Sequence, residues 1–135
     1  MAGTPHHHAY EWLGPGQYLI KPGDAVRRPG HPEFASTAMM PLECADWLRK
    51  PARFIKETFT SPTAATEWFR GRVTGHQDLF AELPVPFGGW REVDRRLAAA
   101  EDFVGGWYVK GDRFLSLNLI ACPNRLRPEY GCPAR

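Results

Sequence analysis

The sequence has few cysteines and no long apolar run, and each shortage excludes a class of protein. Three cysteines among 135 residues are an odd number, and too few for the disulfide framework of a small secreted domain. No segment approaches the ~18 apolar residues of a membrane-spanning helix, and the first residues lack the basic and apolar regions of a secretory signal. We therefore expect a cytoplasmic protein that makes no membrane contact.

An excess of charge of one sign is also missing. Lys and Arg together number 17 against 15 Asp and Glu, which gives a net charge of +2 and a pI near 8.5. Domains that bind nucleic acid through a basic surface have a pI above about 9, so nucleic acid is an unlikely partner here. Arginine, alanine, glycine and proline are abundant together, which is typical of translation from a GC-rich genome.

The amino-acid composition and the length are typical of one globular domain over residues 1–135. Hydrophobic residues make up 43% and charged residues 24%, and this length can bury a core without help from disulfides or metals. We divide the chain into a loop-rich arm with a short strand (1–40), a body of helices and a C-terminal hairpin (41–121), and an irregular tail (122–135).

The arm is rich in turn formers, yet it carries many apolar side chains. Gly-Pro and Pro-Gly pairs interrupt it at short intervals, and residues 17–21 between two of them favour a strand. Leaving its aromatic surface in water is unfavourable by ~25 cal/mol per Å², so we expect the arm to dock on the domain or on a second subunit. Trp12, Tyr18 and His31 are its candidate binding residues.

The spacing of apolar residues predicts three or four helices after the arm. Residues 37–49 and 74–83 have helical spacing. Ser61-Pro62 is a strong helix start, because serine can cap a free amide and proline at the first position sacrifices no needed donor. The longest apolar stripe covers residues 90–104, and Gly105-Gly106 is its expected end.

A β-hairpin is predicted directly after the last helix. Residues 107–110 and 113–121 flank Gly111-Asp112, a dipeptide suited to a two-residue turn, and in that register Tyr108 faces Leu115.

The second hairpin strand is longer than the first and needs another neighbour, which we expect to be a strand at 53–59 or the one at 17–21. The fold class expected is therefore α+β, with three to four helices packed on a small, mainly antiparallel sheet that ends in a helix followed by a hairpin.

A metal site is not predicted by the spacing of the cysteines. Structural zinc sites pair their ligands a few residues apart, whereas Cys44, Cys122 and Cys132 are widely separated. The triplet His6 to His8 could bind nickel or copper weakly on a flexible arm, but a plain solvated terminus is the preferred interpretation. We expect no metal and no cofactor.

His76 and Asp78 are candidate catalytic residues, because a histidine with a nearby carboxylate is the minimum for a tuned general base. Residues two apart on a helix do not face each other, which weakens the interpretation.

The order of four segments looks like that of small ADP-ribosyltransferases. The segments are Tyr18 to Gly23, Glu33 to Thr37, the helix through Cys44 to Trp47, and Arg53 to Lys56. That family presents His-Gly-Thr on its first strand, and the matching place here, His8-Ala9-Tyr10, departs from it at two of three positions. The resemblance covers about forty residues. It implies an NAD-using transferase in which His8 and Tyr10 hold NAD while Ser36 and Thr37 line the pocket.

Arginines beside aromatic residues give a third interpretation, a nucleic-acid-binding module. Trp68 to Arg72 contains Arg70 and Arg72, and such pairs can stack bases and clamp phosphates. The aromatics also lie on the apolar stripes of their own helices, which favours a place in the core.

Three functions follow, in order of preference. The first is a small accessory or binding protein that acts through an aromatic-rich surface or pocket on a protein partner or a small molecule, and that can form a homo-oligomer. The second is a compact enzyme of the ADP-ribosyltransferase type, and the third is nucleic-acid binding.

Overall fold

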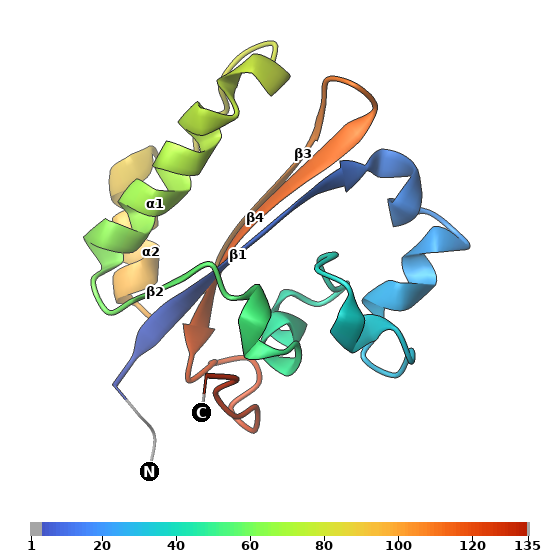
Figure 1. Ribbon diagram of the computed structural model, residues 1–135. Coiled ribbons are helices and arrows are strands. Elements are labelled where there is room, and N and C mark those ends of the chain that lie inside the picture. Colours follow the sequence, from blue (N-terminus) through green and yellow to red (C-terminus); the bar gives the residue numbers. More distant parts are fainter. Residues whose placement is uncertain (1–3, 135) are drawn as a thin grey trace.

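The protein is an α+β domain, seen here in a computed structural model that describes residues 4–134 (Figure 1). Its antiparallel sheet has the strand order β2-β1-β4-β3. The described part of the chain has two α-helices and six short 3-10 helices, none long and apolar enough to cross a membrane. The elements are β1 (His6–Pro15), β2 (Glu57–Phe59), α1 (Pro62–Gly75), α2 (Trp90–Ala98), β3 (Phe103–Val109) and β4 (Arg113–Cys122).

Strand β1 lies inside the sheet, although the sequence predicted a loop-rich arm at this place. It pairs with β2 on one side and along its whole length with β4 on the other. The expected strand at 17–21 is wrong, because Gly16–Leu19 forms a 3-10 helix. The second neighbour of β4 is therefore β1. The sequence did not predict this strand, because its three histidines lack the alternation of apolar and polar residues that is typical of strands.

Helices α1 and α2 cover one face of the sheet (Figure 1). Helix α1 starts as predicted, with the Ser61 hydroxyl accepting a hydrogen bond from the Ala64 amide at 3.2 Å. Helix α2 buries Val93 and Leu97 but ends at Ala98, so the expected helix over 90–104 is too long.

The glycines expected to end that helix lie inside β3 instead. A Cβ atom on Gly105 would stand 2.4 Å from the Trp107 ring, and one on Gly106 would stand 2.6 Å from the Phe114 ring. The two aromatic rings thus occupy the space that side chains would fill, which explains why glycine fits in this edge strand.

The hairpin forms with a register one residue away from the predicted one. Tyr108 pairs with Phe114, because the loop contains three residues, 110–112, rather than two. Gly111 and Asp112 both take positive φ angles, of 81° and 55°, the left-handed conformation for which Gly-Asp is suited.

A chain of 3-10 helices from residue 16 to residue 54 covers the other face of the sheet (Figure 1). Tyr10 of β1 stacks on Trp47 there with ring centroids 4.6 Å apart. The predicted helix at 37–49 is a 3-10 helix over Cys44–Arg49, and the one at 74–83 is reduced to Gln77–Leu79. These segments are short and irregular, so the structure has fewer α-helices than expected.

A buried lysine holds this covering layer together. Lys50 is 1% exposed, and its ammonium donates hydrogen bonds of 2.8 Å to the carbonyls of Phe34 and Thr37. It also lies 3.9 Å from the centroid of the Phe34 ring. Burial without a carboxylate partner disfavours the charged form and lowers the pKa of Lys50 from 10.5 to about 8.

This lowered pKa predicts that Lys50 makes stability rise with pH. Between about pH 8 and 10.5 the unfolded chain keeps a proton that the folded chain has lost, so the unfolded state is disfavoured progressively. We expect the unfolding free energy of the wild type to rise relative to that of Lys50→Met, by up to ~1.4 kcal/mol per pH unit. Urea unfolding of both proteins from pH 7 to 10 measures this difference in unfolding free energy. The exposed Lys56→Met is the control, and an equal pH dependence in both variants would contradict the prediction.

Candidate metal centre

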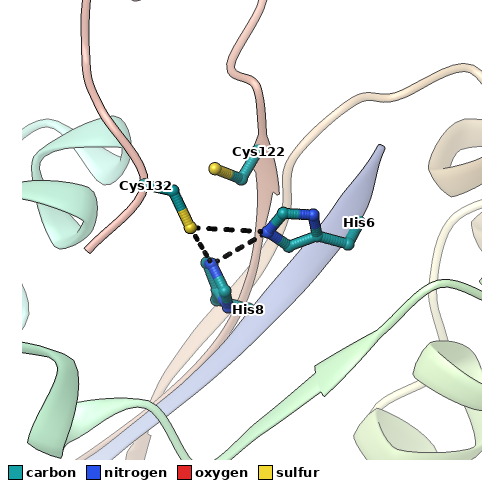
Figure 2. Close-up of side chains that lie close together, drawn as sticks. All are labelled: His6, His8, Cys122 and Cys132. Carbon is teal, nitrogen blue, oxygen red and sulfur yellow. Dashed lines mark hydrogen bonds between the residues drawn. The ribbon is translucent and has the colours of Figure 1, made fainter. Parts of the chain in front are cut away.

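Four side chains with metal-binding atoms converge where β1 begins and β4 ends (Figure 2). They are His6 and His8 of β1, Cys122 of β4, and Cys132 of the tail. Their nitrogen and sulfur atoms all lie within 4.8 Å of one another. Two thiols and two imidazoles in one place form a donor set typical of structural zinc sites.

The sheet itself brings three of the four together. Side chains two apart on a strand point to the same face, so His6 and His8 share a face of β1. The antiparallel register pairs His6 with Cys122, which places the Cys122 side chain on that same face. The tail then returns over the end of the sheet and supplies Cys132 (Figure 2).

The distances among His6, His8 and Cys132 are close to the edges of a tetrahedron, and the Cys122 sulfur lies within 4.8 Å of the other three atoms. With zinc bond lengths of ~2.0 Å to nitrogen and ~2.3 Å to sulfur, two nitrogens stand about 3.3 Å apart and a nitrogen and a sulfur about 3.6 Å apart. The structure has 3.1 Å between Nε2 of His6 and Nε2 of His8. The Cys132 sulfur lies 3.4 Å from His8 Nε2 and 3.7 Å from His6 Nε2.

Both histidine rings are fixed by a second hydrogen bond. His6 Nδ1 donates to the Thr4 carbonyl at 2.6 Å, so in the neutral ring Nε2 carries the lone pair that faces the centre. His8 Nδ1 lies 2.8 Å from the hydroxyl of Thr58, its cross-strand neighbour on β2. Outer partners of this kind orient metal-binding histidines and make their lone pairs more basic.

His8 is suited to bind a metal without competition from protons. It is 1% exposed, and burial together with the neighbouring His6 and His7 lowers its pKa to about 4. The ring is therefore neutral at neutral pH. Without a cation, the two Nε2 atoms 3.1 Å apart are joined by one shared proton, and a metal ion would take the place of that proton.

The tail is anchored to the domain by contacts outside the cluster. Asn124 is 2% exposed and donates hydrogen bonds to Asp102 and to the Ala121 carbonyl. Further along, Arg127 binds the Glu43 carboxylate through two hydrogen bonds. The Tyr130 hydroxyl donates to Asp46 at 2.7 Å. These contacts hold Cys132 near β1, which lowers the entropy cost of closing a site between distant segments.

The third cysteine has a different environment. The Cys44 thiol donates to the carboxylate of Asp102 at 3.5 Å. Burial, together with the negative charge of that carboxylate, raises the pKa of Cys44 to about 11. The thiol keeps its proton at neutral pH.

The residues implied by the resemblance to ADP-ribosyltransferases have other surroundings. His8 belongs to the cluster, and Tyr10 is fully buried against Trp47. The hydroxyl of the exposed Ser36 donates to the carbonyl of Glu33, and the hydroxyl of Thr37 accepts from the Met39 amide. These residues thus make local contacts within a packed layer.

The second candidate group has a different partner from the one in the sequence. Nε2 of His76 lies 3.2 Å from the carboxylate of Glu11, while Asp78 is exposed. Arg72 binds the same carboxylate through two hydrogen bonds of 2.6 and 2.8 Å. Those hydrogen bonds hold the pKa of Glu11 below its usual range, although burial opposes them.

The remaining predicted binding residues are spread over the surface. Arg70 packs over the ring of Trp90, and Tyr18 is 47% exposed. Trp12 is half-buried and folds over Gly14, and His31 accepts a hydrogen bond from the Glu33 amide. The structure does not bring them together into one site.

Exposed apolar side chains gather in a different place, beside the edge strand β3. A groove of about 680 Å³ lies between β3, α2 and the loop 84–87. Phe87 on its rim is fully exposed and Val85 is 72% exposed. A patch of this kind is typical of a surface that contacts another molecule. The expectation of a protein or small-molecule partner stays a prediction.

Comparisons of the chain with protein-family models, with curated proteins and with solved structures found no significant match. The chemistry of the centre is therefore inferred from the residues that form it. Sequence spacing missed it because Cys132 lies far along the chain from His6 and His8. The His-x-His pattern followed by strand-like residues was the one signal in the sequence.

Proposed function

We propose that this is a zinc-binding protein whose ion is held by His6, His8, Cys122 and Cys132. The observation that supports it is the convergence of two imidazole nitrogens and two sulfurs within 4.8 Å, with the distances among His6, His8 and Cys132 close to those of a tetrahedral site. No metal was expected from the sequence, and that expectation rested on spacing along the chain alone.

The donor set favours zinc over other common ions. Magnesium and calcium prefer oxygen ligands, and none of these four side chains offers one. A tetrahedral set of two sulfurs and two nitrogens is typical of zinc, whereas copper(II) and nickel(II) favour square-planar arrangements. Thiolates also bind Cu(I), but a set with two imidazoles is more typical of zinc.

Four protein ligands make this a closed site. Catalytic zinc keeps a position open for water, whereas structural zinc has four protein ligands. The ion would hold the beginning of β1 to the end of β4 and the tail, which lie far from β1 in the sequence. This role agrees with the preferred expectation of a binding or accessory protein more than with an NAD-using transferase.

A cysteine nucleophile is the second candidate for the same residues. The Cys132 sulfur lies 3.4 Å from His8, and His8 in turn contacts Thr58, an order similar to that of a nucleophile, a base and an orienting group. Cys122 and His6 crowd the same space within 4.8 Å, where a nucleophile would need room for its substrate. The geometry therefore favours the metal.

The proposal predicts that the chain binds one zinc ion with a gain in stability. Chelator-treated protein should take up one Zn²⁺ per chain, and Co²⁺ in its place should show the visible absorption of tetrahedral thiolate coordination. At free zinc a hundred times the dissociation constant, we expect the unfolding free energy to rise by about 2.7 kcal/mol.

Variants separate this site from weak binding by the histidine triplet. The double variant C122S/C132S keeps all three histidines and should lose both the zinc and the gain in stability, while C44S should behave as the wild type. Binding that survives the double substitution would contradict the proposal, as would the absence of zinc from the wild type.

A further prediction concerns the hydrogen bond between His8 Nδ1 and the Thr58 hydroxyl, in which a metal-binding His8 donates and Thr58 accepts. Thr58→Val keeps the shape and strand preference of the side chain but removes its hydroxyl, and loss of an outer-shell partner typically weakens metal binding about 10–100-fold. Competition with a zinc indicator measures the affinity. Thr58→Ser should restore it and Thr60→Val should leave it unchanged, so an equal loss in the valine and serine variants would point to packing instead.

A further inference from the structure

Two of the four proposed ligands are thiols that lie next to each other. The sulfurs of Cys122 and Cys132 are within 4.8 Å, and both face the same pair of histidines. Figure 2 shows them on one side of the cluster, with Cys122 coming from the end of β4 and Cys132 from the tail. We infer that a peroxide oxidises this pair to a disulfide and thereby releases the zinc, an inference that rests on the proposed zinc site.

The two sulfurs differ in their access to solvent, which sets the order of attack. Cys122 is 4% exposed, whereas Cys132 in the tail is partly exposed. A small hydroperoxide therefore reaches Cys132 first. Cys122 is the resolving thiol behind it, as in redox sites where a reactive cysteine lies next to a second one.

The chemistry needs only the peroxide and two protons. The Cys132 thiolate attacks one peroxide oxygen, the O–O bond breaks, and hydroxide leaves to be protonated to water. The Cys122 thiolate then attacks the Cys132 sulfenic sulfur, an S–S bond forms and the S–O bond breaks, which releases a second hydroxide that is also protonated. The two sulfurs together lose two electrons, the peroxide gains them, and zinc stays Zn²⁺.

Loss of the ion follows from the change in its ligands. Thiolates are the charged donors of the site, and a disulfide sulfur has no negative charge to offer. Only the two neutral imidazoles of His6 and His8 would remain. A pair of neutral ligands holds zinc far more weakly than a closed set of four, so oxidation opens the site that the tail had closed.

The third thiol provides a control within the same chain. Cys44 contacts the Asp102 carboxylate and keeps its proton, so it is the poorest nucleophile of the three. Selective oxidation of the other pair is therefore expected, with Cys44 recovered as a free thiol.

The experiment uses the full chain loaded with zinc and titrated with hydrogen peroxide. The zinc content is measured first, then released zinc is followed with a colorimetric chelator, and peptide mass mapping locates the disulfide. We expect one zinc released per disulfide, a link between Cys122 and Cys132, and recovery of zinc binding after reduction with dithiothreitol. C44S should release zinc as the wild type does.

Each outcome decides one proposal or both. If no zinc binds at the loading step, both the zinc site and its oxidation are wrong. If zinc binds but stays bound until the sulfurs are over-oxidised, or leaves without a Cys122–Cys132 disulfide, the redox inference is wrong and the zinc site stands.

Discussion

The pairing of β1 with β4 is the interaction on which the rest of the structure depends. All ten residues of β1 pair with β4, and no other strand in the described part of the chain pairs over a longer stretch. One face of this ribbon takes α1 and α2, and the other takes the 3-10 layer around Trp47. The register also sets His6 beside Cys122, so the same ladder builds both the core and the candidate centre.

The parts of the fold that the sequence predicted have strong local signals. Ser61-Pro62 starts a helix through hydrogen-bonding groups within one turn, and Gly111-Asp112 marks a turn through its backbone preference. Strand β1 could not be found in this way, because His8 and Glu11 are polar and yet lie inside the sheet. Its burial depends on partners such as Thr58 and Arg72, which only the folded chain brings near.

The candidate centre was even harder to predict from the sequence than strand β1. A short zinc motif is visible in sequence because its ligands come from one turn or hairpin. Here the two histidines and the two cysteines are far apart in the sequence. Strand pairing and a tail anchored through Asn124 and Tyr130 bring them together. Even a correct list of elements would not have placed Cys132, since its position depends on side-chain contacts made by an irregular segment.

The place of β1 in the sheet has a consequence for how the protein is made. During synthesis this strand leaves the ribosome first, while β4, its main partner, leaves last of the four strands. The central ladder therefore cannot form until residue 122 has been made, and its contacts join residues about a hundred positions apart. Such contacts slow folding and leave a strand edge unpaired in the nascent chain, which is when a chaperone or an early zinc ion would matter most.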